Sequence, residues 1–211
     1  MTVVVLAPWI PGYVNLLHGA TDAIRLAASI SINDSARRAL KNGAEEISKQ
    51  IGFPPGYLNE QRLFIKKFAA NGDLEAVVAG RGRATSLLRF AAGNYTPEST
   101  RPGGADVGRV AIRVKPGGGL RSVQRGFVLR LKSGRGITEE NFNLGLAIRL
   151  KPGQAVDRKY KQSKPIFKNV YLLYGPSVAQ ALQSEWPKLA PKISQFLDTE
   201  FARQLGVQLG K

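Results

Sequence analysis

Three runs in the second half of the sequence alternate apolar residues with Arg or Lys, and this alternation constrains the fold more than any other feature. The runs are residues 109–115, 125–132 and 144–151. Alternation with a period of two is typical of a β-strand that turns one face toward a core. We therefore predict antiparallel strands that form a sheet with one apolar face and one basic face.

A hairpin is predicted earlier in the chain. Residues 62–69 and 74–80 are rich in apolar residues and flank Asn71 and Gly72. This dipeptide favours a tight turn with positive φ, which joins two antiparallel strands. Residues 93–108 are rich in Gly, Pro and Thr and are predicted to form a loop.

Helical spacing dominates the N-terminal part. Small and apolar residues recur at this spacing over residues 16–51, which predicts one long helix or two stacked helices. Asp34 and Ser35 are candidates for the N-cap of a second helix, and Gly52 precedes two prolines that end the helical pattern. Packing in a core is the expected use of such an Ala-rich stretch.

The C-terminal part is helical again. Ser177 is a candidate N-cap for a segment that runs to Ser184, and Pro187 and Pro191 are expected to break or restart the helix. Beyond them, apolar residues follow a helical stripe: Ile193, Phe196, Leu197, Phe201 and Leu205.

The order of these elements predicts an α+β fold with an antiparallel β-sheet flanked by N-terminal and C-terminal helices. Residues 1–15 are apolar but interrupted by Pro8 and Pro11, which favours an extended N-terminal arm. Residues 16–211 are expected to form a single α+β domain. No apolar run approaches the roughly 20 residues that cross a bilayer, so no membrane partner is expected.

Positive charge is concentrated in one region. The net charge of the chain is +16, and residues 81–168 carry 19 basic and 5 acidic residues, a net of +14. Clustered Lys and Arg favour a polyanionic or acidic neighbour. Charge alone leaves three interpretations open: contact with DNA, contact with an acidic protein, or a solvated face. The candidate contacts are Arg121, Arg125, Arg130, Lys132 and Arg135.

Residue types that carry catalysis or bind metals are sparse. The chain has no cysteine, and His18 is its single histidine. No Gly-x-Ser-x-Gly nucleophile motif and no phosphate-binding glycine motif is present, and Glu139-Glu140 is the only acidic pair in the basic region. We therefore expect no catalytic residue, no cofactor, no metal site and no enzymatic activity.

The most specific motif is Tyr174-Gly-Pro-Ser177, within residues 164–182. Gly175 permits a sharp chain reversal, Pro176 fixes φ, and Ser177 can cap a helix. The motif predicts a corner between a strand and a helix.

This segment resembles the minor tail protein Z family of prophages. The matching residues are Pro165, Ile166, Tyr174, Gly175, Pro176, Ser177 and Val178. Residues 85–90, 125–134 and 201–205 follow the order of the family, and the resemblance spans about residues 36–209. Two features depart from the family: residues 1–15 have no counterpart, and Gly134-Arg135 replaces the usual Gly-His.

The resemblance implies a structural virion protein of a tailed phage. Such a protein completes the head-proximal end of the tail and enables the tail to join the head. It is expected in the virion, and in the host cytoplasm during assembly. The implied partners are further copies in a ring, commonly a hexamer, and a connector, tail terminator or tail tube protein. Genomic DNA in the channel is a further implied contact, and the N-terminal arm is expected to reach a neighbouring subunit.

Two alternatives belong to other classes. The basic region 81–168 is compatible with a nonspecific DNA-binding module. A tail-associated enzyme is the second alternative, and the lack of a usable His, Cys or paired carboxylates argues against it.

Overall fold

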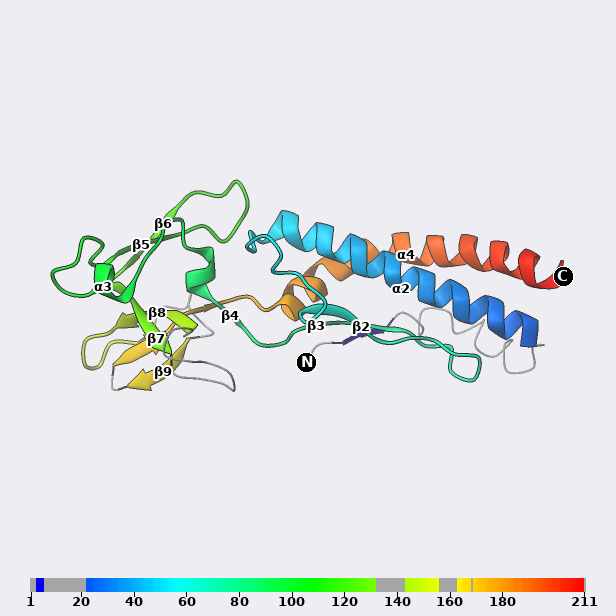
Figure 1. The fold of residues 1–211 in the computed structure, drawn as a ribbon, viewed down its shortest axis with the longest axis horizontal. Helices are drawn as coiled ribbons and strands as arrows, with labels where there is room; N and C mark the ends of the chain where they lie inside the picture. The colour runs from blue at the N-terminus through cyan, green and yellow to red at the C-terminus, as the bar shows by residue number, and fades with distance from the viewer. Residues whose placement is uncertain (1–2, 6–21, 132–142, 156–162, 168, 211) are drawn as a thin grey trace. The chain divides into compact units, whose positions relative to one another are not determined.

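The computed structural model describes residues 3–5, 22–131, 143–155, 163–167 and 169–210. Within these ranges, long helices lie in the N-terminal and C-terminal parts of the sequence, and antiparallel strands lie mostly between them (Figure 1). The α+β class predicted from the sequence is confirmed. The predicted end of the N-terminal arm at residue 15 lies outside the described residues.

Contacts within the chain divide it into two compact units. Unit 1 comprises Met1–Ser48, Gly56–Arg83 and Ser177–Lys211. Unit 2 comprises Lys49–Pro55 and Ala84–Pro176. The chain therefore leaves unit 1 and returns to it, so that the strands of the middle of the sequence form a unit of their own.

Unit 1 contains a three-stranded antiparallel sheet in the order β1-β3-β2. The strands are β1 (Val3–Val5), β2 (Leu63–Lys67) and β3 (Val77–Gly80). β3 is the central strand, and all four of its residues are buried. The predicted hairpin is confirmed as the pairing of β2 with β3. Val3–Val5, from the segment predicted to be an arm, pairs with β3 of the same chain.

The turn of this hairpin differs from the prediction. Ala70 and Asp73 exchange two backbone hydrogen bonds of 2.9 and 3.0 Å, but neither Asn71 nor Gly72 has positive φ. The predicted positive-φ turn is therefore wrong. Asn71 and Gly72 form a two-residue turn between the bridged residues Ala70 and Asp73, which lie beyond the ends of β2 and β3.

The N-terminal helical pattern forms one helix, α2 (Asp22–Gln50). The alternative of two stacked helices with a cap at Asp34 or Ser35 is wrong, because Ser35 is fully buried in the middle of the helix and Asp34 bonds to Arg37 at 2.7 Å. The predicted end before Gly52 is confirmed.

The C-terminal pattern also forms one helix, α4 (Val178–Leu209), which contains both Pro187 and Pro191. The predicted break at these prolines is wrong. A proline within a helix removes one backbone donor, but packing outweighs this cost where the apolar face of the helix is buried. Leu182, Leu189 and Ile193, on both sides of the prolines, are each no more than 2% exposed.

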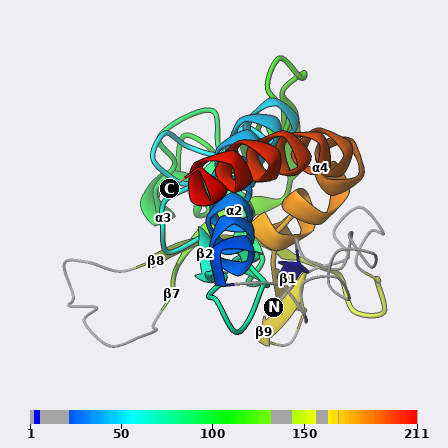
Figure 2. The same cartoon turned by 90° about the vertical axis from the view of Figure 1, so that its right-hand side faces the viewer.

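α2 and α4 run antiparallel and side by side (Figures 1 and 2). Small residues line the buried face of α2, including Ala36 and Gly43. A Cβ added at Gly43 would lie 3.1 Å from Cδ1 of Leu182, so the glycine lets α4 approach closely. The Arg38 guanidinium lies 4.3 Å from the centre of the Phe196 ring, which adds a cation–π contact at the edge of this interface.

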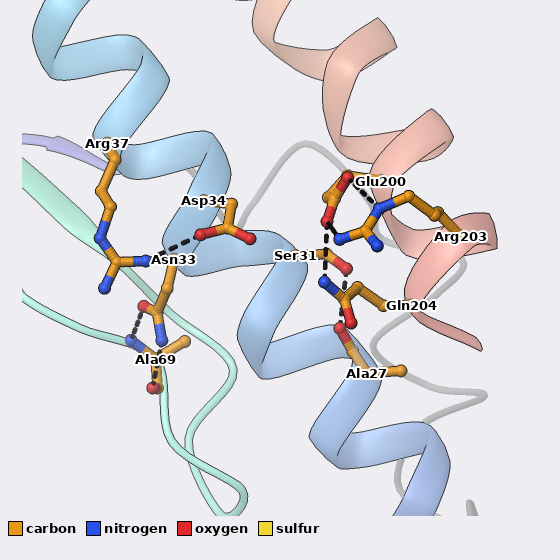
Figure 3. Close-up of polar contacts among 9 residues, drawn as sticks. All are labelled: Ala27, Ser31, Asn33, Asp34, Arg37, Ala69, Glu200, Arg203 and Gln204. Atoms are coloured by element: carbon orange, nitrogen blue, oxygen red, sulfur yellow. Dashed lines mark hydrogen bonds and ion pairs between the residues drawn. The ribbon is translucent and has the colours of Figure 1, made fainter. Parts of the chain in front are cut away.

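Polar contacts complete unit 1 (Figure 3). The Asn33 side chain donates to the Ala69 carbonyl at 3.0 Å and accepts from the Ala69 amide at 2.8 Å, which ties α2 to the end of β2. On α4, the Glu200 carboxylate accepts from Arg203 Nε at 2.9 Å and from Gln204 Nε2 at 2.8 Å. Glu200 and Gln204, which are both buried, therefore satisfy each other.

Unit 2 contains a four-stranded antiparallel sheet in the order β7-β8-β10-β9 and two shorter strand pairs, β5 with β6 and β11 with β4. The strands of the four-stranded sheet are β7 (Gly126–Leu131), β8 (Asn143–Arg149), β9 (Lys164–Phe167) and β10 (Val170–Leu172). The shorter pairs are formed by β4 (Thr85–Ser86), β5 (Arg109–Ile112), β6 (Arg121–Gln124) and β11 (Tyr174–Gly175). A 3-10 helix, η2 (Leu87–Phe90), and a short helix, α3 (Pro97–Thr100), complete unit 2.

The loop predicted over residues 93–108 contains α3. The Thr96 side chain accepts from the Ser99 amide at 3.0 Å, and the Ser99 hydroxyl accepts from the Thr96 amide at 3.2 Å, which makes a capping box. Thr100 is 2% exposed, and its hydroxyl accepts from the Val128 amide at 2.8 Å. This hydrogen bond attaches α3 to β7.

The three alternating runs do form strands, but the prediction of one apolar and one basic face is wrong. β5 pairs with β6 and not with β7 or β8, so the three runs do not share one sheet. In β8, four consecutive residues, 145–148, are buried, and the flanking Arg149 is exposed. Both faces of the middle of β8 are covered, so the cationic residue of this strand, Arg149, lies at its end.

Candidate functional site

Positive charge on unit 2 is entirely exposed in the described part of the chain. Between residues 84 and 176, eleven described residues are Arg or Lys and two, Glu98 and Asp106, are acidic. All eleven basic residues are exposed: Arg89, Arg101, Arg109, Arg113, Lys115, Arg121, Arg125, Arg130, Arg149, Lys151 and Lys164. The surface of unit 2 is therefore suited to an anionic neighbour.

The predicted contact residues occupy different positions on this surface. Arg121 is the first residue of β6, and Arg125 lies between β6 and β7 with a φ of 58°. This left-handed conformation is uncommon for a residue with a side chain, and it marks the sharp turn between the two strands. Lys132 and Arg135 lie outside the described residues.

Arg130, on β7, already has a partner within unit 2. Its Nη2 lies 3.1 Å from Oε1 of Glu98, and both side chains are more than half exposed. The pKa of Glu98 lies below its ordinary value, first because the carboxylate accepts a hydrogen bond from its own backbone amide, then because of Thr96 and the positive charges of Arg130 and Arg101. The availability of Arg130 for an external anion is reduced accordingly.

A groove of about 560 Å³ lies within unit 2. We call it the unit 2 groove, and its lining residues are Leu87, Ile112, Val114, Lys115, Gly118, Gly119, Arg121, Ser122, Tyr174, Gly175 and Pro176. The groove brings together two features that the sequence presented separately: Arg121, from the predicted cationic contacts, and the first three residues of the predicted corner.

Strand pairing positions the groove residues. β5 and β6 pair so that Ile112 faces Arg121 across the ladder. On the other side, β11 pairs with β4 so that Tyr174 faces Ser86, and the Leu87 amide donates to the Leu173 carbonyl at 3.0 Å. Two short strand pairs therefore form the walls of the groove.

The motif Tyr174-Gly-Pro-Ser177 joins β11 to α4: Tyr174 and Gly175 form β11, and Ser177 is the N-cap of α4. The Ser177 hydroxyl accepts from the Gln180 amide at 3.1 Å, and the Gln180 side chain accepts from the Ser177 amide at 3.0 Å. These two bonds form a capping box, so the predicted N-cap is confirmed.

The role of Gly175 differs from the prediction. Gly175 does not have positive φ, so chain reversal is not what requires glycine. A Cβ at this position would lie 3.1 Å from Cε2 of Phe90 and 3.5 Å from Cδ1 of Leu87. The absence of a side chain at Gly175 therefore lets β11 pack closely on η2.

Sequence reasoning did not identify Lys115 and the strand β6 as parts of a site. The strand β6 has only four residues, of which Val123 alone is buried. The sequence carries a weak signal for this strand, because a single apolar residue, Val123, between polar neighbours is the pattern of a short half-buried strand.

The described residues were predicted from the sequence to hold no metal ion, and their carboxylates can be compared with that expectation. No group of three or more His, Cys, Asp or Glu residues is placed to bind a metal ion among the described residues. His18, Glu139 and Glu140 lie outside the described residues. Among the helices described, none is long and apolar enough to cross a membrane.

Comparisons of the chain with known protein families, with curated proteins and with solved structures found no match.

Proposed function

We propose that this chain is a structural protein of a tailed phage virion, which completes the head-proximal end of the tail and enables it to join the head. In this proposal the chain has no enzymatic activity, and several copies form a ring, commonly of six subunits, around the DNA channel. The resemblance of the corner segment to the minor tail protein Z family supports the assignment.

The partners of the corner residues are the observation that carries the proposal. Gly175 packs on Phe90, and Ser177 and Gln180 cap α4. A motif that carried chemistry would present side chains toward a reacting group, whereas these residues are engaged in packing and capping. Their partners favour an architectural use of the motif, as expected for a protein that acts by assembly.

Exposed cations support the second part of the proposal, a place beside DNA or an acidic protein surface. The eleven exposed basic residues described between residues 84 and 176 outnumber the two described carboxylates there, and one of these carboxylates already pairs with Arg130. Such a surface attracts phosphates or carboxylates over distances up to about a Debye length, roughly 8 Å at physiological salt.

The same cations favour the second candidate function, a nonspecific DNA-binding module. A salt titration with a 30-base-pair duplex separates the two functions. A DNA-binding module would bind tightly as a monomer, and its affinity would fall steeply with salt because each phosphate contact releases counterions. A tail-completion protein is expected to bind the duplex weakly when isolated.

The oligomeric state of the purified full-length chain tests the proposed function in the same preparation. Native mass spectrometry, followed by negative-stain imaging, is expected to detect closed rings of identical subunits at micromolar concentration. A protein that stays monomeric at all concentrations and binds the duplex with a steep salt dependence would refute the tail-completion role.

A further inference from the structure

We infer that the unit 2 groove binds an acidic peptide segment of another protein, one whose Asp or Glu residues flank apolar side chains. The inference rests on the proposed function for the origin of the peptide, a neighbouring virion protein. Its physical basis is the combination of an apolar lining with two exposed cations in a single groove.

The apolar part of the lining comes from three separate elements. Leu87 belongs to η2, Ile112 ends β5, and Tyr174 belongs to β11. Leu87 and Ile112 are 4% and 6% exposed, so they are part of the core of unit 2, which fixes the position of the groove wall. An apolar side chain that enters the groove would bury its surface against these residues without a rearrangement of the core.

The cationic part comes from Lys115 and Arg121. Both side chains are exposed, and neither makes an ion pair with a carboxylate of the described residues. Glu98, one of the two described acidic residues of unit 2, is already paired with Arg130. A carboxylate brought by a partner would therefore meet two cations that have no competing ion pair in the described chain.

The groove is large enough for more than one side chain of a ligand. Its volume of about 560 Å³ is within the range of ligand pockets and exceeds the volume of one side chain. Gly118 and Gly119 lie on the lining, and a Cβ added at Gly119 would meet no atom within 4 Å. The absence of a side chain at Gly119 leaves open space on this part of the lining for a peptide backbone.

Nucleic acid fits this groove less well than a peptide does. A phosphate backbone is bound through charge and hydrogen bonds, and it gains little from a lining of Leu87, Ile112 and Val114. A peptide with alternating carboxylates and apolar side chains uses both parts of the lining at once. Contact between DNA and the other exposed cations is a separate event.

Fluorescence anisotropy with the full-length protein tests the inference. The probe is a fluorescein-labelled octapeptide that alternates Asp and Leu, compared with octapeptides that alternate Asp and Ser or Lys and Leu. The Asp-Leu peptide is expected to bind at least about 10-fold more tightly than either comparison peptide, because only it satisfies both the cations and the apolar lining. Equal binding of the Asp-Ser peptide would overturn the role of the lining.

Variants locate the binding site. Lys115→Glu with Arg121→Glu is expected to weaken Asp-Leu binding at least about 10-fold, and Gly119→Trp is expected to weaken it similarly by filling the groove. The control for the charge pair is Lys151→Glu with Arg109→Glu, which changes the net charge by the same amount outside the groove. The control for Gly119→Trp is Gly72→Trp, because a Cβ added at Gly72 also lies more than 4 Å from any other atom. These controls are expected to change the affinity less than about 3-fold.

Three results would overturn the inference. Equal weakening by the groove and control charge pairs would assign the binding to diffuse charge. Unchanged binding in Gly119→Trp would place the peptide elsewhere. Displacement of the peptide by a short duplex, with loss of duplex binding in Gly119→Trp, would assign the groove to nucleic acid. Each of these results leaves ring formation intact, whereas failure of the proposed function would appear as a monomer, so the two failures are distinguishable.

Discussion

Gly80→Ala is expected to destabilise unit 1, because the glycine sets the distance between β3 and the first turn of α4. A Cβ at position 80 would lie 2.7 Å from Cα of Ala179 and 2.8 Å from its backbone nitrogen. Carbon atoms pack at about 3.5–4.0 Å, so the helix and the strand would have to separate by close to 1 Å. The obstructing atoms belong to the backbone, and rotation of a side chain cannot relieve the clash.

Separation would also strain the hydrogen bond from the Ala179 amide to the Arg81 carbonyl, which is 3.2 Å long. Overpacking of a well-packed site costs about 1–3 kcal/mol. Weakening of this hydrogen bond adds to the cost, and the higher strand propensity of Ala offsets part of it. We expect a net loss of about 2 kcal/mol in the free energy of unfolding.

Urea unfolding followed by circular dichroism at 222 nm measures this loss, since α2 and α4 dominate the signal. Gly72→Ala is the matched control, because its Cβ meets no atom within 4 Å and its φ is not positive. The control is expected to change stability by less than about 1 kcal/mol. If Gly80→Ala unfolds at the same urea concentration as the control, the close approach of α4 to β3 does not exist in solution.

Two further predictions concern α4. Ser177→Ala removes the hydroxyl that accepts from the Gln180 amide, and it is expected to lower the free energy of unfolding by about 1 kcal/mol in the same urea assay. Thr199→Ala, at an exposed position in the middle of α4, is the control. Equal effects of the two substitutions would contradict the capping role of Ser177. Hydrogen bonding to Arg203, and then that to Gln204, lowers the pKa of Glu200 in the folded protein. The contribution of Glu200 to stability is therefore complete above its unfolded-state pKa. This contribution is lost as the pH falls through the lower folded-state pKa. Glu200→Gln should therefore flatten the acid side of the stability–pH curve, and an unchanged acid side in this variant would exclude Glu200 as the titrating group.

Much of the architecture was predictable because local periodicity and burial agree. The helical spacing predicted the helix α2 over its described residues 22–50, and the strands on both sides of Asn71 were also predicted, since each pattern has one face in a core. The N-cap at Ser177 was also predictable, because a hydroxyl three residues before a Gln is a local signal that needs no tertiary contact.

The wrong predictions concern positions where tertiary packing overrides a local preference. Pro187 and Pro191 are strong helix breakers, yet α4 continues through them because buried residues flank both. The alternation in β8 predicted one basic face, but Gly145 allows Leu131 and Leu172 to close over the strand, where an added Cβ would lie 2.9 and 2.7 Å from them. No short stretch of the sequence contains both partners of these contacts.

The unit 2 groove illustrates the same limit for the candidate site. Lys115 and Tyr174 lie 59 positions apart in the sequence but line one groove, because β5 and β11 are both placed around η2. Charge counting found Arg121, and motif recognition found Tyr174. Neither method indicates that the two residues share a surface, since that depends on the pairing of four short strands.

A cryo-electron microscopy reconstruction of the phage particle that carries this chain tests the central claim most directly. We expect density for α2, α4 and the sheets of both units at the head-proximal end of the tail, in a closed ring around the channel, with the basic surface of unit 2 against DNA or an acidic neighbour. Density for the chain at the distal end of the tail, or purified infectious particles that lack the chain, would contradict a role in joining the tail to the head.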